Sequence, residues 1–169
     1  MNIEKYNAFI DEQKNYFNQN LQSNFKWNWD DSSWYGGTIG SGWLLSRSGK
    51  THFTFGTIKK MKGIENNIID PIFQEFIKSV LILSYRKSNS KSSPQKLYAE
   101  FLILKRWYSA LYAEKIESIH PCHLSTLILN NSFEILAENS SKTNLPDHAG
   151  TYLRLQEMLN HYGFTEQPL

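Results

Sequence analysis

Cysteine is almost absent from this chain of 169 residues, and long apolar runs are missing. The one cysteine, Cys122, cannot pair within the chain, so nothing requires an oxidising compartment and we expect a cytoplasmic protein. Apolar runs such as residues 80–83 are far shorter than the roughly 18 to 20 residues that span a bilayer. The polar N-terminus also lacks the apolar core of a signal peptide. We therefore expect a protein without a membrane segment.

Signatures of catalysis, metal binding and nucleotide binding are missing as well. The Gly-Lys-Thr of residues 49–51 resembles the end of a P-loop, but Leu44 stands where that motif needs glycine, and a strand is expected to follow. Residues 120–123 group three metal-ligating side chains without the second pair that a zinc site requires. No nucleophile and base pattern stands out. We expect no cofactor, no metal and no catalytic residue; a small enzyme with an unrecognised site is a third, less favoured interpretation.

Positive charge, by contrast, is concentrated in the middle third of the chain. Residues 47–106 contain twelve Lys and Arg against four Asp and Glu, whereas residues 1–46 and 107–169 are both acidic. The net charge of +2 therefore conceals a chain that is polarised along its length. Such asymmetry is typical of proteins that bind a polyanion such as nucleic acid, although an ordinary solvated surface has the same pattern.

Composition changes near residue 65, which predicts two domains, 1–65 and 66–169. The first is rich in aromatic residues and glycine. Its apolar spacing predicts a helix over about residues 4–18. Alternation predicts a strand over 51–56 with Phe53 and Phe55 on one face, and residues 42–45 are its expected partner. We expect its clustered rings to form a core rather than to stack on bases. These rings belong to Trp27, Trp29, Trp34, Tyr35 and Trp43.

The second domain reads as four helices. Asp70 and Pro71 are a typical N-cap and first helical residue, Pro94 and Pro121 suit two further starts, and Gly163 suits the stop of the last helix. The expected helices cover about residues 71–87, 94–116, 121–138 and 147–162. Apolar spacing predicts that their buried faces contain Ile72, Phe73, Phe76, Val80, Leu83, Leu97, Phe101, Leu104, Tyr108, Leu111, Leu124, Leu127, Ile128, Ile135, Leu136, Leu153, Leu155, Met158 and Leu159. At Pro121 we expect a packed Cys122 with surface histidines beside it. The predicted class is mainly α, a four-helix bundle preceded by a small α+β module.

Cations alternate with hydroxyl and amide side chains between residues 85 and 96, and more cations follow along the next helix. Lysine and arginine attract phosphate without regard to sequence, while serine and free helix N–H groups donate to phosphate oxygens. The predicted contacts here are Arg86, Lys87, Lys91, Ser92, Lys96, Lys105 and Arg106. A second basic group flanks the expected strand and consists of Arg47, Lys50, Lys59, Lys60 and Lys62. A solvated loop or face is the alternative in both places.

One stretch of the chain resembles a known family. Phe76-Ile-Lys78-Ser-Val80, Tyr85-Arg86-Lys87, Pro94-Gln-Lys96 and Leu104-Lys-Arg106-Trp-Tyr108-Ser-Ala110-Leu111 are similar to the N-terminal region of bacterial and phage integrases, the tyrosine-type site-specific recombinases. The tryptophan-rich residues 27–34 and the segment 149–164 resemble flanking parts of the same group. The resemblance implies a helical, SAM-like core-binding domain that packs across one face of DNA and forms half of a C-shaped clamp.

The catalytic half of that family is not recognisable here. It uses a His-x-x-Arg element and a nucleophilic tyrosine, and because no His-x-x-Arg occurs, no tyrosine of this chain is assigned that role. The chain is then part of a longer integrase, or a relative that binds without cutting. The expected partner is double-stranded DNA, with self-association on DNA left open. The rival is a protein-interaction module, an accessory of a phage or mobile element, that works through its acidic helices between residues 107 and 162.

Overall fold

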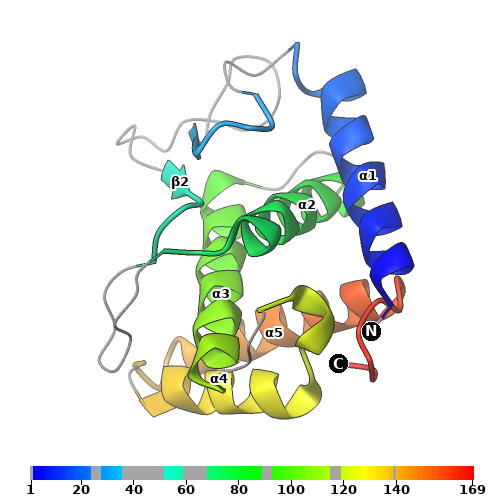
Figure 1. Ribbon diagram of the computed structural model, residues 1–169. Helices are drawn as coiled ribbons and strands as arrows, with labels where there is room; N and C mark the ends of the chain where they lie inside the picture. Colours follow the sequence, from blue (N-terminus) through cyan, green and yellow to red (C-terminus); the bar gives the residue numbers. More distant parts are fainter. Residues whose placement is uncertain are drawn as a thin grey trace. The chain divides into compact units, whose positions relative to one another are not determined.

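The computed structural model describes residues 2–23, 28–35, 52–58, 68–88, 93–114, 119–138 and 140–169 (Figure 1). Helices dominate these residues, and the strands form a single two-stranded sheet. The prediction of a mainly α chain with a small N-terminal α+β part is therefore confirmed. In chain order the elements are α1 Ile3–Asn20, β1 Ser33–Tyr35, β2 His52–Thr54, α2 Pro71–Lys87, α3 Pro94–Ala113, the 3-10 helix η1 Pro121–His123, α4 Thr126–Glu138 and α5 Leu145–Asn160. No helix in the described ranges combines the length and the hydropathy needed to cross a membrane.

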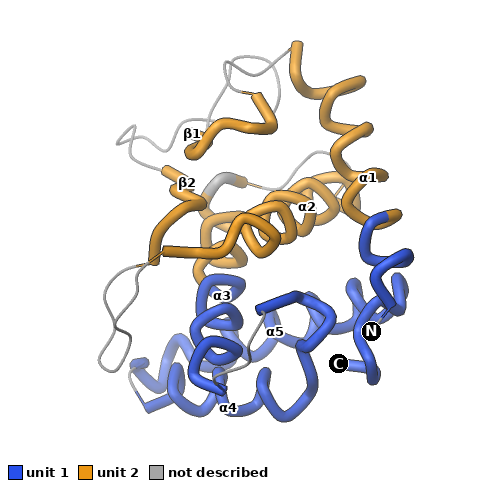
Figure 2. The backbone as a smooth tube through the Cα atoms, in the orientation of Figure 1, with its two compact units in different colours: residues 1–7, 103–169 blue, residues 8–102 orange. Residues whose placement is uncertain are grey.

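The chain divides into two compact units (Figure 2). Unit 1 contains residues 1–7 and 103–169, and unit 2 contains residues 8–102, so the division falls within α1 and within α3. The boundary expected from composition, between residues 65 and 66, lies outside the described residues and stays a prediction.

In unit 2, β1 and β2 form an antiparallel pair in which Trp34 lies opposite Phe53. Paired residues of a sheet share a face, and both rings are fully buried together with Phe55. The expectation that Phe53 and Phe55 share a face is confirmed. Phe101 of α3 packs against the rings of Phe53 and Phe55, at centroid distances of 5.3 and 5.7 Å. Residues 42–45, the expected partner of the strand, lie outside the described part of the chain.

Tryptophans complete the core of unit 2, as the sequence predicts. Trp34 stacks on Phe17 of α1 at 5.5 Å with nearly parallel rings, and Trp29 meets both of these rings edge-on or tilted. Trp29 and Trp34 are buried, so their role in the core is confirmed. Trp27, Trp43 and the side chain of Tyr35 lie outside the described part.

Helix α2 starts where local chemistry predicts and is buried on nearly all sides. The Asp70 carboxylate accepts a hydrogen bond from the Ile72 N–H at 2.9 Å, and Pro71 occupies the first helical position. Every residue of the helix from 76 to 85 is buried. Ile72 is 41% exposed, which corrects the buried stripe expected for it. The reason is its place in the first turn, ahead of the fully enclosed stretch.

Unit 1 is built on the second half of α3 with α4 and α5. Trp107 and Phe133 pack edge-on against Tyr152, whose hydroxyl forms a 2.7 Å hydrogen bond with Ser132. Only one face of α4 and of α5 is covered, which corrects three expectations of burial: Leu127, Ile135 and Leu153 are 68%, 51% and 60% exposed.

The segment around Pro121 differs from the expected helix start. It forms the short η1, and α4 begins only at Thr126. Cys122 is buried as predicted, but the prediction of a surface position is wrong for His120, which is also buried. Its ring packs 4.5 Å from Tyr6, and its Nδ1 accepts a hydrogen bond from the Cys122 N–H at 3.1 Å.

Helix α5 ends at Asn160, and Gly163, the predicted stop residue, follows three residues later. Gly163 has a φ of +58°, a left-handed conformation that glycine adopts without steric cost. The tail then returns to the helix, because Asn160 exchanges two hydrogen bonds with the backbone of Leu169, at 2.6 and 3.0 Å.

Candidate nucleic-acid interface

The described residues contain five of the twelve predicted phosphate contacts. Arg86 and Lys87 lie in the last turn of α2, and Lys96 lies in the first turn of α3. Lys105 and Arg106 also lie on α3, but in the part that belongs to unit 1. The remaining predicted contacts, Arg47, Lys50, Lys59, Lys60, Lys62, Lys91 and Ser92, are outside the described residues.

Lys87 and Lys96 are exposed, one before and one after residues 89–92. Neither ammonium forms an ion pair with a residue of the described ranges. The Ser93 hydroxyl accepts a hydrogen bond from the Lys96 N–H at 3.2 Å and so caps α3. The end of α2 carries the partial negative charge of its carbonyl groups, which basic residues in the last turn balance. Lys87 therefore lies in the last turn of α2 and Lys96 in the first turn of α3, and both side chains are exposed to solvent.

Arg86 is held by helix α1. Its Nη1 donates to Glu12 Oε1 at 2.8 Å and to Gln13 Oε1 at 2.7 Å. Its guanidinium carbon lies 4.4 Å from the ring centroid of Tyr16, which is a cation–π distance. The Gln13 side chain is fully buried, whereas the side chains of Arg86 and Glu12 are 28% and 45% exposed. The guanidinium of Arg86 is thus held in place by residues of α1 and is still partly accessible to solvent.

Lys105 and Arg106 are half-buried in unit 1. Burial lowers the pKa of Lys105 to about 8. Burial raises the pKa of Tyr152, while its hydrogen bond to Ser132 and the charge of Arg106 oppose that shift. With a pKa of about 8, the Lys105 amine is mostly protonated below pH 8 and mostly neutral above it.

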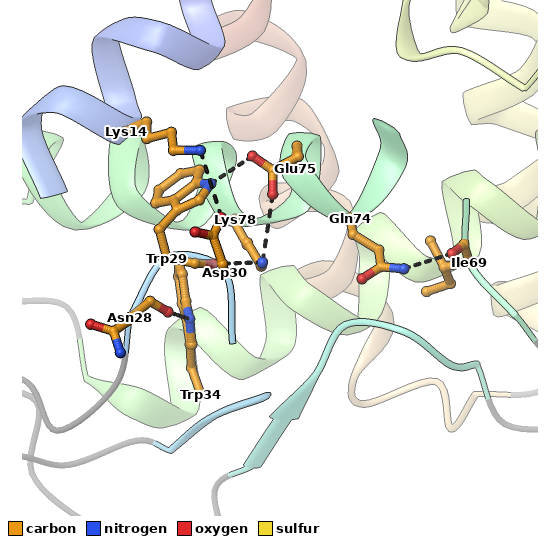
Figure 3. A network of polar contacts seen from close by, with 9 residues as sticks. All are labelled: Lys14, Asn28, Trp29, Asp30, Trp34, Ile69, Gln74, Glu75 and Lys78. Atoms are coloured by element: carbon orange, nitrogen blue, oxygen red, sulfur yellow. Dashed lines mark hydrogen bonds and ion pairs between the residues drawn. The ribbon is translucent and has the colours of Figure 1, made fainter. Parts of the chain in front are cut away.

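One lysine of the basic middle third is enclosed in the core of unit 2 (Figure 3). The Lys78 Nζ donates to the Trp29 carbonyl oxygen at 2.6 Å and lies 3.6 Å from Glu75 Oε1. It also lies 5.2 Å from the ring centroid of Phe55 and 5.9 Å from that of Trp34. Burial lowers the pKa of Lys78, and the charge of Glu75 partly opposes the shift. This ammonium is unavailable to an external phosphate.

The same network fixes the segment that precedes β1. Trp29 Nε1 donates to Glu75 Oε2 at 2.6 Å, and Trp34 Nε1 donates to the Asn28 carbonyl oxygen at 3.0 Å (Figure 3). On the outer side, Lys14 of α1 lies 3.7 Å from Asp30 and 5.9 Å from the Trp29 ring centroid. Residues 28–34 are thereby tied to α2 and α1 through polar as well as aromatic contacts.

The sequence did not predict the partners of Arg86 or those of Lys78. Glu12 and Gln13 lie four and three residues before Tyr16, the spacings that bring side chains close together on a helix surface, but this pattern is not diagnostic. Lys78 carried a stronger signal, since it interrupts an apolar run and follows Glu75 by three residues. A lysine in such a position is buried only with a counter-charge, which Glu75 supplies.

The comparisons with known proteins add no family. No protein-family model, curated protein or solved structure matches this chain. The part of the chain that the structure describes also contains no group of three or more His, Cys, Asp or Glu side chains that could hold a metal ion.

Replacing Glu75 should destabilise the protein more than replacing Lys78. Glu75→Ala leaves the Lys78 ammonium buried beside fewer compensating groups, so the free energy of unfolding should fall by about 2 to 4 kcal/mol. Lys78→Met removes the charge and retains an apolar side chain of similar length, so the loss should be smaller. Urea denaturation followed by tryptophan fluorescence measures both. Equal losses would show that the charge of Lys78 is not what Glu75 compensates.

The stability of the protein should depend on the ionisation of Lys105. Its pKa of about 8 in the folded state is lower than that of an unfolded lysine, about 10.4. Between these values the unfolded state binds more protons, so the contribution of Lys105 to the free energy of unfolding rises with pH. Urea denaturation from pH 7 to 10 should therefore show a steeper upward slope for the wild type than for Lys105→Met. Parallel curves would contradict the burial of this amine.

Proposed function

We propose that this chain binds double-stranded DNA through the phosphate backbone, in the region where α2 ends and α3 begins. The observation that carries the proposal is the pair of exposed lysines, Lys87 and Lys96, that flank residues 89–92. Those residues add Lys91 and Ser92 to the same stretch of sequence. Two helix ends with exposed ammonium groups and a serine-rich connection supply both the attraction and the directed donors that phosphate oxygens accept.

We further propose that the chain is the DNA-binding region of an integrase-like recombinase and carries no catalytic centre of its own. The motif resemblance over residues 76–111 supports this, and the mainly helical fold fits a core-binding domain. On this proposal the basic residues between 86 and 96 would bind one side of the duplex, and cutting would belong to a separate domain.

Binding to duplex DNA should be strongly salt-dependent. With about five phosphates neutralised, the logarithm of the association constant should fall against the logarithm of salt concentration with a slope of roughly −4 to −5. Lys91→Glu with Lys96→Glu should weaken binding to all sequences alike, because phosphate contacts do not read bases. Fluorescence anisotropy with two unrelated duplexes at several salt concentrations measures both effects.

Lys142→Glu is the matched control, because Lys142 is exposed in unit 1 and the substitution changes the net charge by the same amount per site. It should leave the affinity nearly unchanged at about 150 mM salt, because Lys142 is not one of the proposed phosphate contacts. No binding of the wild-type chain at about 50 mM salt would refute the proposed function.

A protein-interaction module is the second candidate, and a specific observation favours it. Leu127 and Ile135 on α4 and Leu153 on α5 are more than half exposed, on helices that also carry Glu134, Glu138 and Glu157. A contiguous exposed apolar surface is typical of a site that another protein covers, and these three side chains would contribute to such a surface on this candidate. Size-exclusion chromatography with light scattering should show a stable oligomer if this candidate holds, with an elution volume that DNA does not alter. A monomer whose elution shifts with DNA would exclude self-assembly and favour the first proposal.

A further inference from the structure

The guanidinium of Arg86 is held in position by two residues of helix α1. Gln13 is fully buried in unit 2 and accepts a hydrogen bond from Arg86 Nη1 at 2.7 Å. The ring centroid of Tyr16 lies 4.4 Å from the guanidinium carbon of Arg86. Both partners come from α1, one helical turn apart, so they hold the planar group from one helix face. The position of the guanidinium therefore does not depend on Glu12 alone.

Glu12 occupies the outer side of this guanidinium. Its Oε1 lies 2.8 Å from the same Nη1, and its side chain is 45% exposed. A carboxylate and a phosphate group present the same kind of acceptor to a guanidinium, and both are recognised by arginine in the same geometry. An ion pair that water reaches is weak, so exchanging one acceptor for the other costs little.

We propose that Arg86 is a phosphate-binding position that Glu12 occupies in the free protein, and that a phosphate of the bound nucleic acid replaces the Glu12 carboxylate. This inference rests on the proposed DNA binding and specifies how its site is regulated. Lys87 follows Arg86 in the chain and is exposed, so the incoming phosphate meets a second cation in the last turn of α2. Gln13 and Tyr16 keep the guanidinium in place after Glu12 leaves, so little ordering is needed at the moment of binding.

Glu12→Gln tests the competition because it keeps the shape of the side chain and removes only its charge. At about 150 mM salt the variant should bind duplex DNA about two- to fivefold more tightly than the wild type, which is the size expected for losing one exposed ion pair. Asp11→Asn is the matched control: it removes the same charge from the neighbouring, exposed residue of α1. Within the described residues Asp11 forms no ion pair with Arg86, so Asp11→Asn should change the affinity by much less.

The dependence on Arg86 is tested by combining substitutions. In an Arg86→Gln background, Glu12→Gln should no longer strengthen binding, because the position for which the two anions compete is gone. Thermal unfolding by circular dichroism establishes that each variant is folded. If Arg86→Gln does not fold, the titration with a small anion decides the question on folded variants.

That titration uses pyrophosphate and the NMR signal of the Arg86 side chain. The signal should shift at lower pyrophosphate concentration in Glu12→Gln than in the wild type and in Asp11→Asn. Equal effects of Glu12→Gln and Asp11→Asn on DNA affinity, or an Arg86 signal that pyrophosphate leaves unchanged in every variant, would overturn the inference. Failure of the wild type to bind DNA with a pyrophosphate shift intact would instead refute the duplex as the ligand and leave Arg86 as an anion position.

Discussion

The arrangement of unit 2 depends on the burial of one ammonium group, that of Lys78. Removing a charge from water costs several kcal/mol, so the folded state needs partners that repay this cost in fixed positions. The partners are the Trp29 carbonyl oxygen and the Glu75 carboxylate, and the Trp29 ring N–H also donates a hydrogen bond to that carboxylate. Because Trp29 is 49 residues away from Lys78 in the sequence, this bond specifies where a distant segment lies. Aromatic rings alone can pack against one another in several arrangements. A hydrogen bond from Lys78 to the Trp29 carbonyl oxygen, by contrast, fixes the position of that part of the backbone.

Lys78 and Arg86 of α2 illustrate that a cation in the sequence is not always available to a ligand. Lys78 is enclosed and used internally, although it contributes to the positive charge of residues 47–106. Arg86 is also engaged, but with a partner that water reaches. The desolvation cost separates the two cases: a phosphate could replace Glu12 at Arg86 with little loss, while nothing external reaches Lys78. Charge counts along a sequence therefore overstate the field of the folded surface.

Local chemistry could be read from the sequence, and tertiary context could not. The Asp70 cap, the proline after it and the glycine stop at 163 are contacts or conformations of a few neighbouring residues, and the structure has all of them. Which side of α4 is covered depends on what packs there, so Leu127 and Ile135 were wrongly expected inside. His120 was likewise expected at the surface because its partner Tyr6 lies at the other end of the chain. The site shows the same limit: Lys87 and Lys96 are exposed as a surface role requires, but the Glu12 partner of Arg86 is 74 residues distant.

The burial of α2 also decides how the chain could meet DNA under the proposed function. Residues 76 to 85 are covered on all sides, so this helix has no free face to place in a groove. Its last turn, with Arg86 and Lys87, is accessible, and residues 89–92 connect it to the capped start of α3. The ends of helices can reach phosphates, but base edges lie deep in the grooves and are usually read by a helix or strand inserted there. Contacts from this region would then fix the register and orientation of a duplex, and any preference for sequence would have to come from another part of the protein.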